Sequence, residues 1–138
     1  MDCVFCRIIN REEDAYVVYE DEYVIAILDK YPVSRGHTLV MPKRHYRDLM
    51  EIPNDELCRV ITVTKLIATA VKEGLGAPGV RVVQNNGSEA GQVIFHIHFH
   101  VIPMGGHVGG RHVLTREEGY EVSTVLRSTI NKLRGGVQ

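Results

Sequence analysis

Residues 96–103 read His-Ile-His-Phe-His-Val-Ile-Pro, so three histidines alternate with apolar residues. Successive side chains of a β-strand point to opposite faces of the sheet. The pattern therefore predicts a strand that buries its apolar side chains on one face and projects His96, His98 and His100 from the other. Imidazole titrates near neutral pH and can act as nucleophile, acid, base or metal ligand. Three of them on one face indicate a chemical site rather than a packing surface.

The composition is that of one globular domain. The chain has 138 residues, of which 44% are hydrophobic and 24% charged, and its formal net charge is −1. We therefore expect neither nucleic acid nor a membrane as a partner. No apolar run reaches transmembrane length, and the start Met1-Asp2-Cys3 lacks the features of a signal peptide, so a cytoplasmic protein is expected. Three cysteines are an odd number, which argues against a disulfide framework.

Apolar and β-branched runs alternate with turn residues along the chain, and one long helical pattern interrupts them. Strands are expected at 16–19, 23–28, 37–41, 80–84 and 96–103, a long helix from Asn54 to Gly74, and a final helix over 122–133. The short connections favour antiparallel pairing. We therefore predict an α+β fold, a single antiparallel sheet of about five strands with one long helix on one face and a C-terminal helix.

The long helix is expected to serve packing rather than chemistry. Asn54 is its expected N-cap. The residues expected to face the core are Leu57, Val60, Ile61, Ile67, Ala68 and Val71, with Cys58 as a small core residue. A wider apolar face, formed by Val63, Leu66 and Ala70, is compatible with a partner subunit.

Three segments together resemble the histidine triad (HIT) superfamily. Residues 96–102 match its His-φ-His-φ-His-φ-φ signature, where φ is apolar. Residues 36–45 look like its Gly-His-x-Leu-Val-x-Pro-Lys-x-His stretch, and residues 85–92 like its Asn-x-Gly-x-x-x-Gly-Gln loop. The resemblance covers about residues 3–103 of a single domain, 1–138. Residues 104–138 form a variable part, with a Gly-rich loop expected to be mobile and the final helix.

The resemblance implies hydrolysis or transfer at the α-phosphate of a nucleotide. The family's nucleophile corresponds to His98, which would form a covalent nucleotidyl-histidine that water then cleaves. His100 would donate to a phosphate oxygen or protonate the leaving group. His37 would support them from a neighbouring strand, although a packed strand histidine is the alternative. The implied substrate is a purine nucleotide derivative, a phosphoramidate or a dinucleoside polyphosphate, with an AMP-like product.

The resemblance also implies a nucleotide-binding set. Asp29 would bind the ribose, and Gln92 would add a side-chain amide to a loop whose glycines let backbone N–H groups approach phosphate. Val93 stands where one branch of the family has Ser or Thr, which puts one hydrogen bond to the phosphate or leaving group in doubt. The remaining members are Phe5, Ile8 and Leu28 as walls of the base pocket, or as plain core, and Asn85 and Gly91 in the phosphate loop.

Cys3 and Cys6 have a C-x-x-C spacing that can hold one metal ion. A redox role would need a βαβ context, which is missing. Family members with this cysteine pair bind zinc with two histidines, which correspond here to His45 and His96. The resemblance thus implies a structural zinc; a pair of buried thiols is the alternative. The triad would then divide into a metal ligand, a nucleophile and a phosphate ligand.

Two other functions stay open. One is a metallohydrolase with all three histidines on one metal, but the first and third lie roughly 13 Å apart on a straight strand, so the strand would have to bend. The other is a nucleotide-binding adaptor with little turnover. Family members are commonly homodimers. His107, Arg111 and His112 follow the Gly-rich segment, where a closing loop could bring Arg111 to a polyphosphate, or the loop could simply be solvated.

Overall fold

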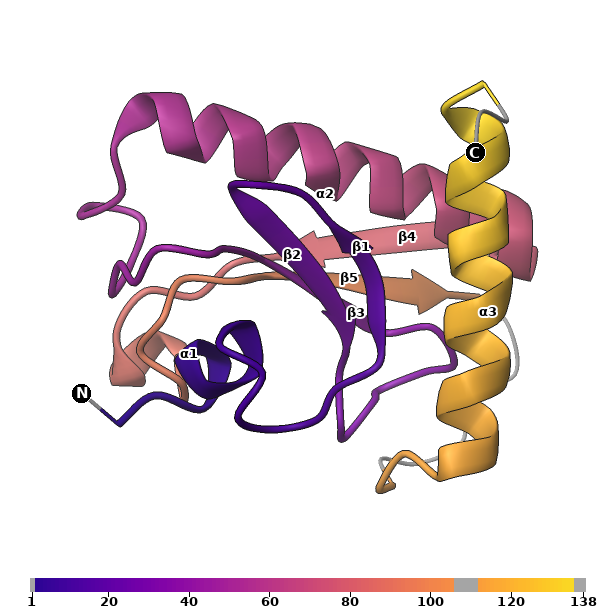
Figure 1. Ribbon diagram of the computed structural model, residues 1–138, viewed down its shortest axis with the longest axis horizontal. Helices are drawn as coiled ribbons and strands as arrows, with labels where there is room; N and C mark the ends of the chain where they lie inside the picture. The colour runs from indigo at the N-terminus through magenta and orange to yellow at the C-terminus, as the bar shows by residue number, and fades with distance from the viewer. Residues whose placement is uncertain (1, 106–111, 136–138) are drawn as a thin grey trace.

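The computed structural model describes residues 2–105 and 112–135. Its strands are β1 (Val17–Glu20), β2 (Val24–Leu28), β3 (Thr38–Pro42), β4 (Gly79–Val83) and β5 (Phe99–Met104); its helices are α1 (Val4–Ile9), α2 (Asn54–Leu75), α3 (Arg116–Leu133) and a 3-10 turn η1 (Ser88–Ala90). The strands form one antiparallel sheet in the order β1-β2-β3-β5-β4 (Figure 1). The predicted α+β fold is thereby confirmed.

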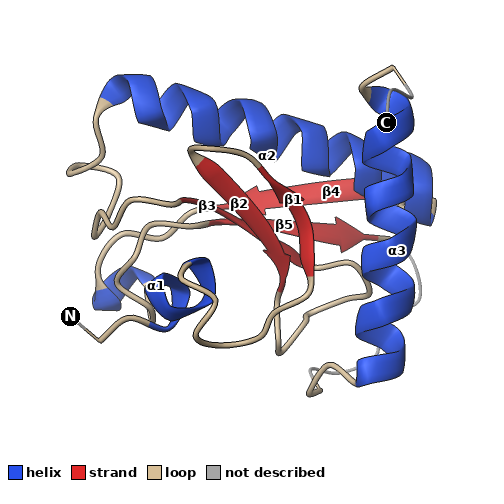
Figure 2. Cartoon of the chain, viewed as in Figure 1, coloured by secondary structure: helices blue, strands red, loops and turns tan. Residues whose placement is uncertain are grey.

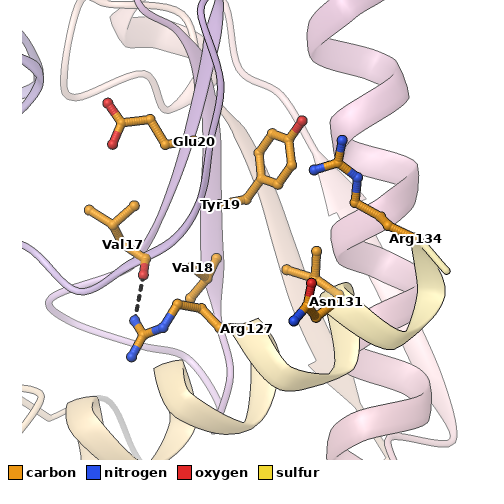
Figure 3. Close-up of a pocket in the computed structure, with 8 residues that line it drawn as sticks. Val17, Val18, Tyr19, Glu20, Arg127, Asn131 and Arg134 are labelled. Carbon is orange, nitrogen blue, oxygen red and sulfur yellow. Dashed lines mark hydrogen bonds between the residues drawn. The ribbon is translucent and has the colours of Figure 1, made fainter. Parts of the chain in front are cut away.

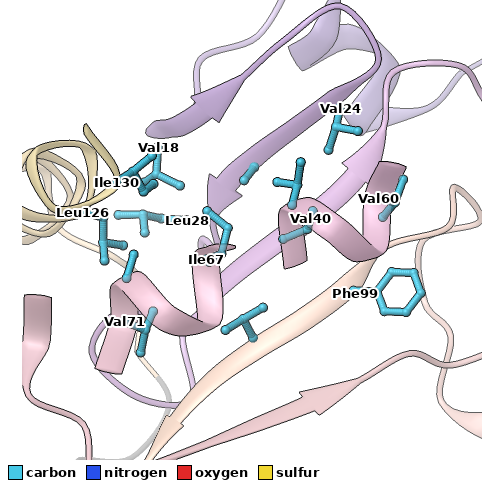
Figure 4. Packing of buried hydrophobic residues seen from close by; sticks show 14 of the residues in the cluster. Val18, Val24, Leu28, Val40, Val60, Ile67, Val71, Phe99, Leu126 and Ile130 are labelled. Atoms are coloured by element: carbon cyan, nitrogen blue, oxygen red, sulfur yellow. The ribbon is translucent and has the colours of Figure 1, made fainter. Parts of the chain in front are cut away.

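Both faces of the central strands are covered. In Figure 2, α2 runs above the strands and α3 stands at the right, whereas α1 lies apart from both. Val24, Ala26 and Leu28 of β2 belong to the core cluster beneath α2 and α3, part of which Figure 4 shows. Ile25 and Ile27, which point the other way, pack in a second cluster with Phe5 of α1. Burial on both faces explains why β2 is a continuous apolar run.

The histidine segment alternates as predicted, but its strand begins later. Ile97, Phe99 and Val101 are buried in the α2-side cluster. The strand starts at Phe99 rather than His96, because the backbone before it pairs elsewhere: the N–H of Ile97 donates to the carbonyl of Tyr46 at 2.8 Å. The sheet thus releases the first two histidines to a loop while it keeps the third in β5.

The helix ends differ from those predicted. Pro53 rather than Asn54 caps α2, which continues past Gly74 to a left-handed Gly76. The final helix begins at Arg116, six residues before the predicted start, and the side chain of Thr115 accepts from the N–H of Glu118. This Thr-x-x-Glu capping signal precedes a polar first turn without an apolar stripe, which is why periodicity alone missed it. The short α1 was not predicted.

Several side chains of α2 lie on a different face from the one predicted. Ile61 is 45% exposed and Cys58 is exposed, so neither is a core residue. Val63 and Ala70 are buried in the core cluster and Leu66 packs against it. They belong to the stripe that covers the sheet and form no separate face for a partner.

A cavity of about 400 Å³ lies between β1 and α3 (Figure 3). Arg127 donates from this helix to the carbonyl of Val17, and Arg134 lies over the ring of Tyr19. None of the residues that line this cavity is a histidine or a cysteine. The predicted site residues therefore lie elsewhere. In the described part of the chain, no helix combines the length and apolarity needed to cross a bilayer.

Candidate active site and metal cluster

The histidines gather on the α1 side of the sheet, where residues 96–100 pass from a loop into β5. The ring centroids of His98 and His100 are 5.0 Å apart. His37, which precedes β3, lies 5.2 Å from His100 between centroids. The pairing of Leu39 with His100 brings these segments together. The structure therefore assembles side chains that are 63 residues apart in sequence.

His98 is held in one orientation and one protonation state. Its Nδ1 lies 2.7 Å from the carbonyl oxygen of His96, and only an N–H can donate to that oxygen. The proton of the neutral ring therefore sits on Nδ1, and Nε2 keeps its lone pair. Burial lowers the pKa of His98, and this effect outweighs the hydrogen bond to His96 and the charge of Asp29. His98 thus presents a neutral imidazole with a nucleophilic Nε2.

A chain of hydrogen bonds sets the protons of the other two rings. The backbone N–H of Val33 donates to Nδ1 of His37 at 3.0 Å, so the proton of His37 lies on Nε2. That Nε2 lies 3.0 Å from Nδ1 of His100 and donates to it. The neutral ring of His100 consequently carries its own proton on Nε2. His100 can therefore donate a hydrogen bond where His98 offers a lone pair.

Asp29, predicted to bind ribose, also lies beside these rings. Its Oδ2 is 3.4 Å from Nε2 of His37, and its Oδ1 accepts from the N–H of Tyr31 at 2.8 Å. The carboxylate thus faces the nitrogen that carries the proton of His37. It adds negative charge beside the hydrogen-bonded pair of His37 and His100.

Cys3, Cys6, His45 and His96 form one cluster whose ligand atoms all lie within 4.8 Å of one another. Nδ1 of His96 is 3.5 Å from Sγ of Cys3 and 3.6 Å from Sγ of Cys6, and Nδ1 of His45 is 3.4 Å from Sγ of Cys6. Tetrahedral zinc with ordinary bond lengths separates its sulfur and nitrogen ligands by about 3.6 Å. These three sulfur–nitrogen separations therefore already match those of a tetrahedral zinc site.

The orientation of His96 suits a metal as well. Its Nε2 donates to the carbonyl of Pro42 at 2.8 Å, which leaves the Nδ1 lone pair toward the thiols. Burial lowers the pKa of His96 to about 4, so this ring stays neutral. Burial and the neighbouring Cys3 raise the pKa of Cys6 to about 11. A cation at the cluster would reverse this effect on the thiols, since metal ligation favours the thiolate.

Asp29, His37 and His100 form a second cluster of ligand atoms. Here the proton positions oppose a metal, because Nε2 of His37 carries the proton that the N–H of Val33 forces upon it. A protonated nitrogen has no lone pair for a metal. A catalytic metal on all three triad histidines is also disfavoured, since Nδ1 of His96 faces the thiols instead.

The loop over 85–92 is held by its own side chains. The Oε1 of Gln92 accepts from the N–H of Gly87 at 2.7 Å, and its Nε2 donates to the carbonyls of Arg47 and Ile94. Gln92 thus shapes the loop, and a direct bond to phosphate would have to replace one of these contacts. Gly91 has a left-handed φ of 97°, and a side chain there would meet the amide of Asn85.

The predicted base-pocket walls divide between the two faces of the sheet. Phe5 is buried and Ile8 half-buried in the α1-side cluster, and the ring of Phe5 lies 5.0 Å from that of His98 between centroids. Leu28 lies in the opposite cluster beneath α2, so the structure does not bring it to Phe5. Its neighbour Ile27 is on the α1 side, because a shift of one residue along a strand changes the face. Val93 is 83% exposed.

The remaining predicted residues lie outside this group. His107, Arg111 and the loop around them fall outside the described residues, so the closing-loop hypothesis stays a prediction. His112 lies 2.9 Å from Glu118 at the start of α3.

Backbone groups orient the site, and sequence reasoning missed them. The carbonyl of Pro42, the N–H of Val33 and the carbonyl of Arg47 each fix one side chain of the site. Every residue carries such groups, so the sequence holds no signal for them. Asn86 is a missed residue that the sequence could have suggested, because it lies in a polar loop. Its Oδ1 accepts a hydrogen bond from the N–H of Leu49.

The chain is similar in sequence and fold to several known proteins. The family model described as HIT domain matches residues 10–107. The adenylylsulfatase HINT3 of Arabidopsis thaliana is 43% identical over 102 residues, 74% of this chain and 52% of that protein. A hypothetical histidine triad nucleotide-binding protein of Sulfolobus tokodaii has 41% identity and a TM-score of 0.92, covering 98% of this chain and 96% of that one. A Zn-bound histidine triad family protein of Mycobacterium smegmatis has 39% identity and a TM-score of 0.88, covering 99% of each chain.

Proposed function

The chain belongs to the HIT domain family, and from this premise we propose that it hydrolyses or transfers a purine nucleotide through His98. The observation that carries the proposal is the 2.7 Å hydrogen bond from Nδ1 of His98 to the carbonyl of His96. It leaves a lone pair on Nε2 of a partly buried imidazole. A neutral imidazole is a competent nucleophile near pH 7.

The proposed reaction has two steps. In the first, Nε2 of His98 bonds to the α-phosphorus while the bond from phosphorus to the leaving group breaks; the Nε2–H of His100 donates a hydrogen bond to the leaving group, which takes its proton from solvent. In the second, water attacks the phosphorus of the nucleotidyl-histidine and loses a proton to solvent. The phosphorus–nitrogen bond then breaks and a nucleoside monophosphate leaves. His37 holds the ring of His100 throughout, because it donates to Nδ1.

The proposed substrate is a purine nucleotide derivative with a bond to break at the α-phosphate. Phosphoramidates and dinucleoside polyphosphates both satisfy that chemistry. The relative named adenylylsulfatase HINT3 supports a substrate with an adenylyl group. The proposed environment is the cytoplasm, and the proposed assembly is a homodimer.

Cys3, Cys6, His45 and His96 are proposed to hold a zinc ion, as the Zn-bound relative from Mycobacterium smegmatis suggests. With four protein ligands such an ion has no open position for substrate, so its contribution is structural. It would tie α1 to the ends of β3 and β5. His98 and His100 would work on the phosphate without it.

A quench experiment tests the nucleophile. The protein is mixed with adenosine phosphoramidate or with diadenosine tri- or tetraphosphate, labelled in the adenylyl group and its α-phosphate, and denatured within the first turnover. We expect label covalently attached to the native chain and none on His98→Ala. His112→Ala is the matched control, since it removes another histidine, in the loop before α3, and should keep the label.

Three results would contradict the proposal. Equal labelling of His98→Ala would exclude His98 as the nucleophile. AMP binding without label or turnover on any substrate of the panel would favour the adaptor instead. Turnover that rises in step with added metal would favour the metallohydrolase.

A further inference from the structure

Phe5 touches both candidate sites. Its ring centroid is 5.8 Å from that of the metal-cluster residue His96 and 5.0 Å from that of His98. The rings meet nearly at right angles, at 85° and 78°, which is a favourable edge-to-face arrangement. The side chain of Phe5 is only 3% exposed. One buried ring therefore packs against a proposed metal ligand and the proposed nucleophile at once.

A second contact joins the same two histidines. The carbonyl of His96 accepts the hydrogen bond that orients His98. Any constraint on the position of His96 is therefore passed to His98 through the backbone as well as through Phe5. A metal bound at Nδ1 of His96 would be such a constraint.

The helix that carries Phe5 has little stability of its own. α1 has six residues, and helices of this length are marginal in isolation. Its N-cap is Cys3, whose Sγ accepts from the N–H of Cys6 at 3.4 Å. Phe5 lies between these two cysteines in the chain. An ion that holds both thiols would therefore fix the position of Phe5.

We propose that Phe5 is a positioning residue that links the metal cluster to the nucleotide site, so that zinc and AMP each raise the affinity of the other. The proposal rests on the proposed function, because it needs a nucleotide at His98. Zinc restricts α1 and His96, and the nucleotide then binds a site that is already ordered. Linkage requires the two effects to be equal in size, and we expect a factor of about 5 or more.

Two binding measurements test the linkage. The affinity for AMP is measured by calorimetry on the zinc-loaded protein and on protein stripped with a chelator. The affinity for zinc is measured by competition with a chromophoric chelator, with and without saturating AMP. We expect tighter binding of each ligand in the presence of the other, by the same factor.

Substitutions on α1 separate a positioning role from a simple wall of the base pocket. A wall residue would weaken AMP binding equally in the zinc-loaded and stripped forms. For Phe5→Ala we expect a larger loss in the zinc-loaded form, so that the linkage factor falls toward one. Phe5→Leu keeps apolar bulk in the cluster and should also lower the factor. Ile8→Ala, on the same helix, is the matched control and should keep the factor.

The outcomes are distinguishable. Equal AMP affinity of the two forms overturns the linkage and leaves the nucleotide function standing. An unchanged factor in both Phe5 variants overturns the role of Phe5. If neither the zinc-loaded nor the stripped protein binds AMP, and no label appears in the quench experiment, the proposed function is overturned and the linkage with it.

Discussion

At the scale of single residues, backbone carbonyls determine which nitrogen of a histidine can react. The carbonyl of Pro42 accepts a hydrogen bond from Nε2 of His96, and the carbonyl of His96 accepts one from Nδ1 of His98. Two rings separated by one residue therefore present opposite nitrogens. His96 offers Nδ1 to the thiols, and His98 keeps Nε2 for a phosphorus atom. Equivalent residues in the sequence become unequal in chemistry through these contacts.

The N–H of His100 gives a prediction about the leaving group. If this N–H donates a hydrogen bond to the leaving group as its bond to phosphorus breaks, His100→Ala should lose about 10²- to 10³-fold in rate on a phosphoramidate or polyphosphate. The same variant should lose far less on the p-nitrophenyl ester of AMP, whose leaving group departs as an anion without a proton. Steady-state rates on both substrates check this. An equal loss on both would mean that His100 stabilises the phosphate and not the leaving group.

The metal cluster gives a second prediction at this scale. Cys6→Ser removes a ligand atom, so we expect it to lose bound zinc and to melt at a lower temperature than the native protein. A chelator should lower the melting temperature of the native protein toward that of the variant and leave the variant unchanged. Zinc analysis and thermal melts measure both effects. Cys58→Ser, at an exposed cysteine of α2, is the matched control and should keep its zinc; equal zinc in Cys6→Ser would exclude the site.

At the scale of elements, an ion pair crosses the sheet from β1 to the end of β3. The ammonium of Lys43 is 2.7 Å from the carboxylate of Glu20, and the guanidinium of Arg11 is 3.2 Å from the same carboxylate. The hydrogen bond from Lys43, with the charge of Arg11, lowers the pKa of Glu20. A carboxyl whose pKa is lowered in the folded state stabilises the protein at pH values above its pKa in the unfolded state. This stabilisation is lost as the pH falls through the pKa of the folded state.

We therefore expect Glu20→Gln to flatten the acid side of the stability profile. Below the ordinary glutamate pKa of about 4.3, the free energy of unfolding of the native protein should fall more steeply than that of the variant. Urea unfolding across a pH series measures this. Glu22→Gln, at an exposed glutamate of the adjacent turn, is the control. Parallel curves for native and Glu20→Gln would show that the pair adds nothing.

Local pattern predicted the elements better than it predicted the site. The alternation at Ile97, Phe99 and Val101 correctly gave the buried face, because a strand has a fixed period of two. Leu28 was predicted as a base-pocket wall or as plain core, and it lies in the core; its apolar run is buried on both sides and carries no alternation that could decide between the two. The approach of Cys3 to His96, 93 residues away, depends on sheet topology, so only the family resemblance could suggest it.

At the scale of the whole molecule, the two edges of the sheet differ. At the β1 edge, α3 covers the strand and Arg127 donates to the carbonyl of Val17. At the other edge, β4 pairs only with β5 among the described residues, and Val82 is 48% exposed. An open edge with an exposed apolar side chain is suited to pair with another strand. A homodimer would therefore be expected to join through β4, not through β1.

Val82→Lys tests this arrangement, because a charge on the open edge should oppose strand pairing between two copies. We expect the native protein to have the mass of a dimer by light scattering and the variant to shift toward the monomer as it is diluted. Val113→Lys places the same charge at another exposed valine, 58% exposed before α3, and should leave the mass unchanged. A native protein that is monomeric at all concentrations would exclude the dimer, and a dimer that survives Val82→Lys would move the interface away from β4. In either case the histidine cluster would be complete within one chain, since Asp29, His37 and His100 already meet there.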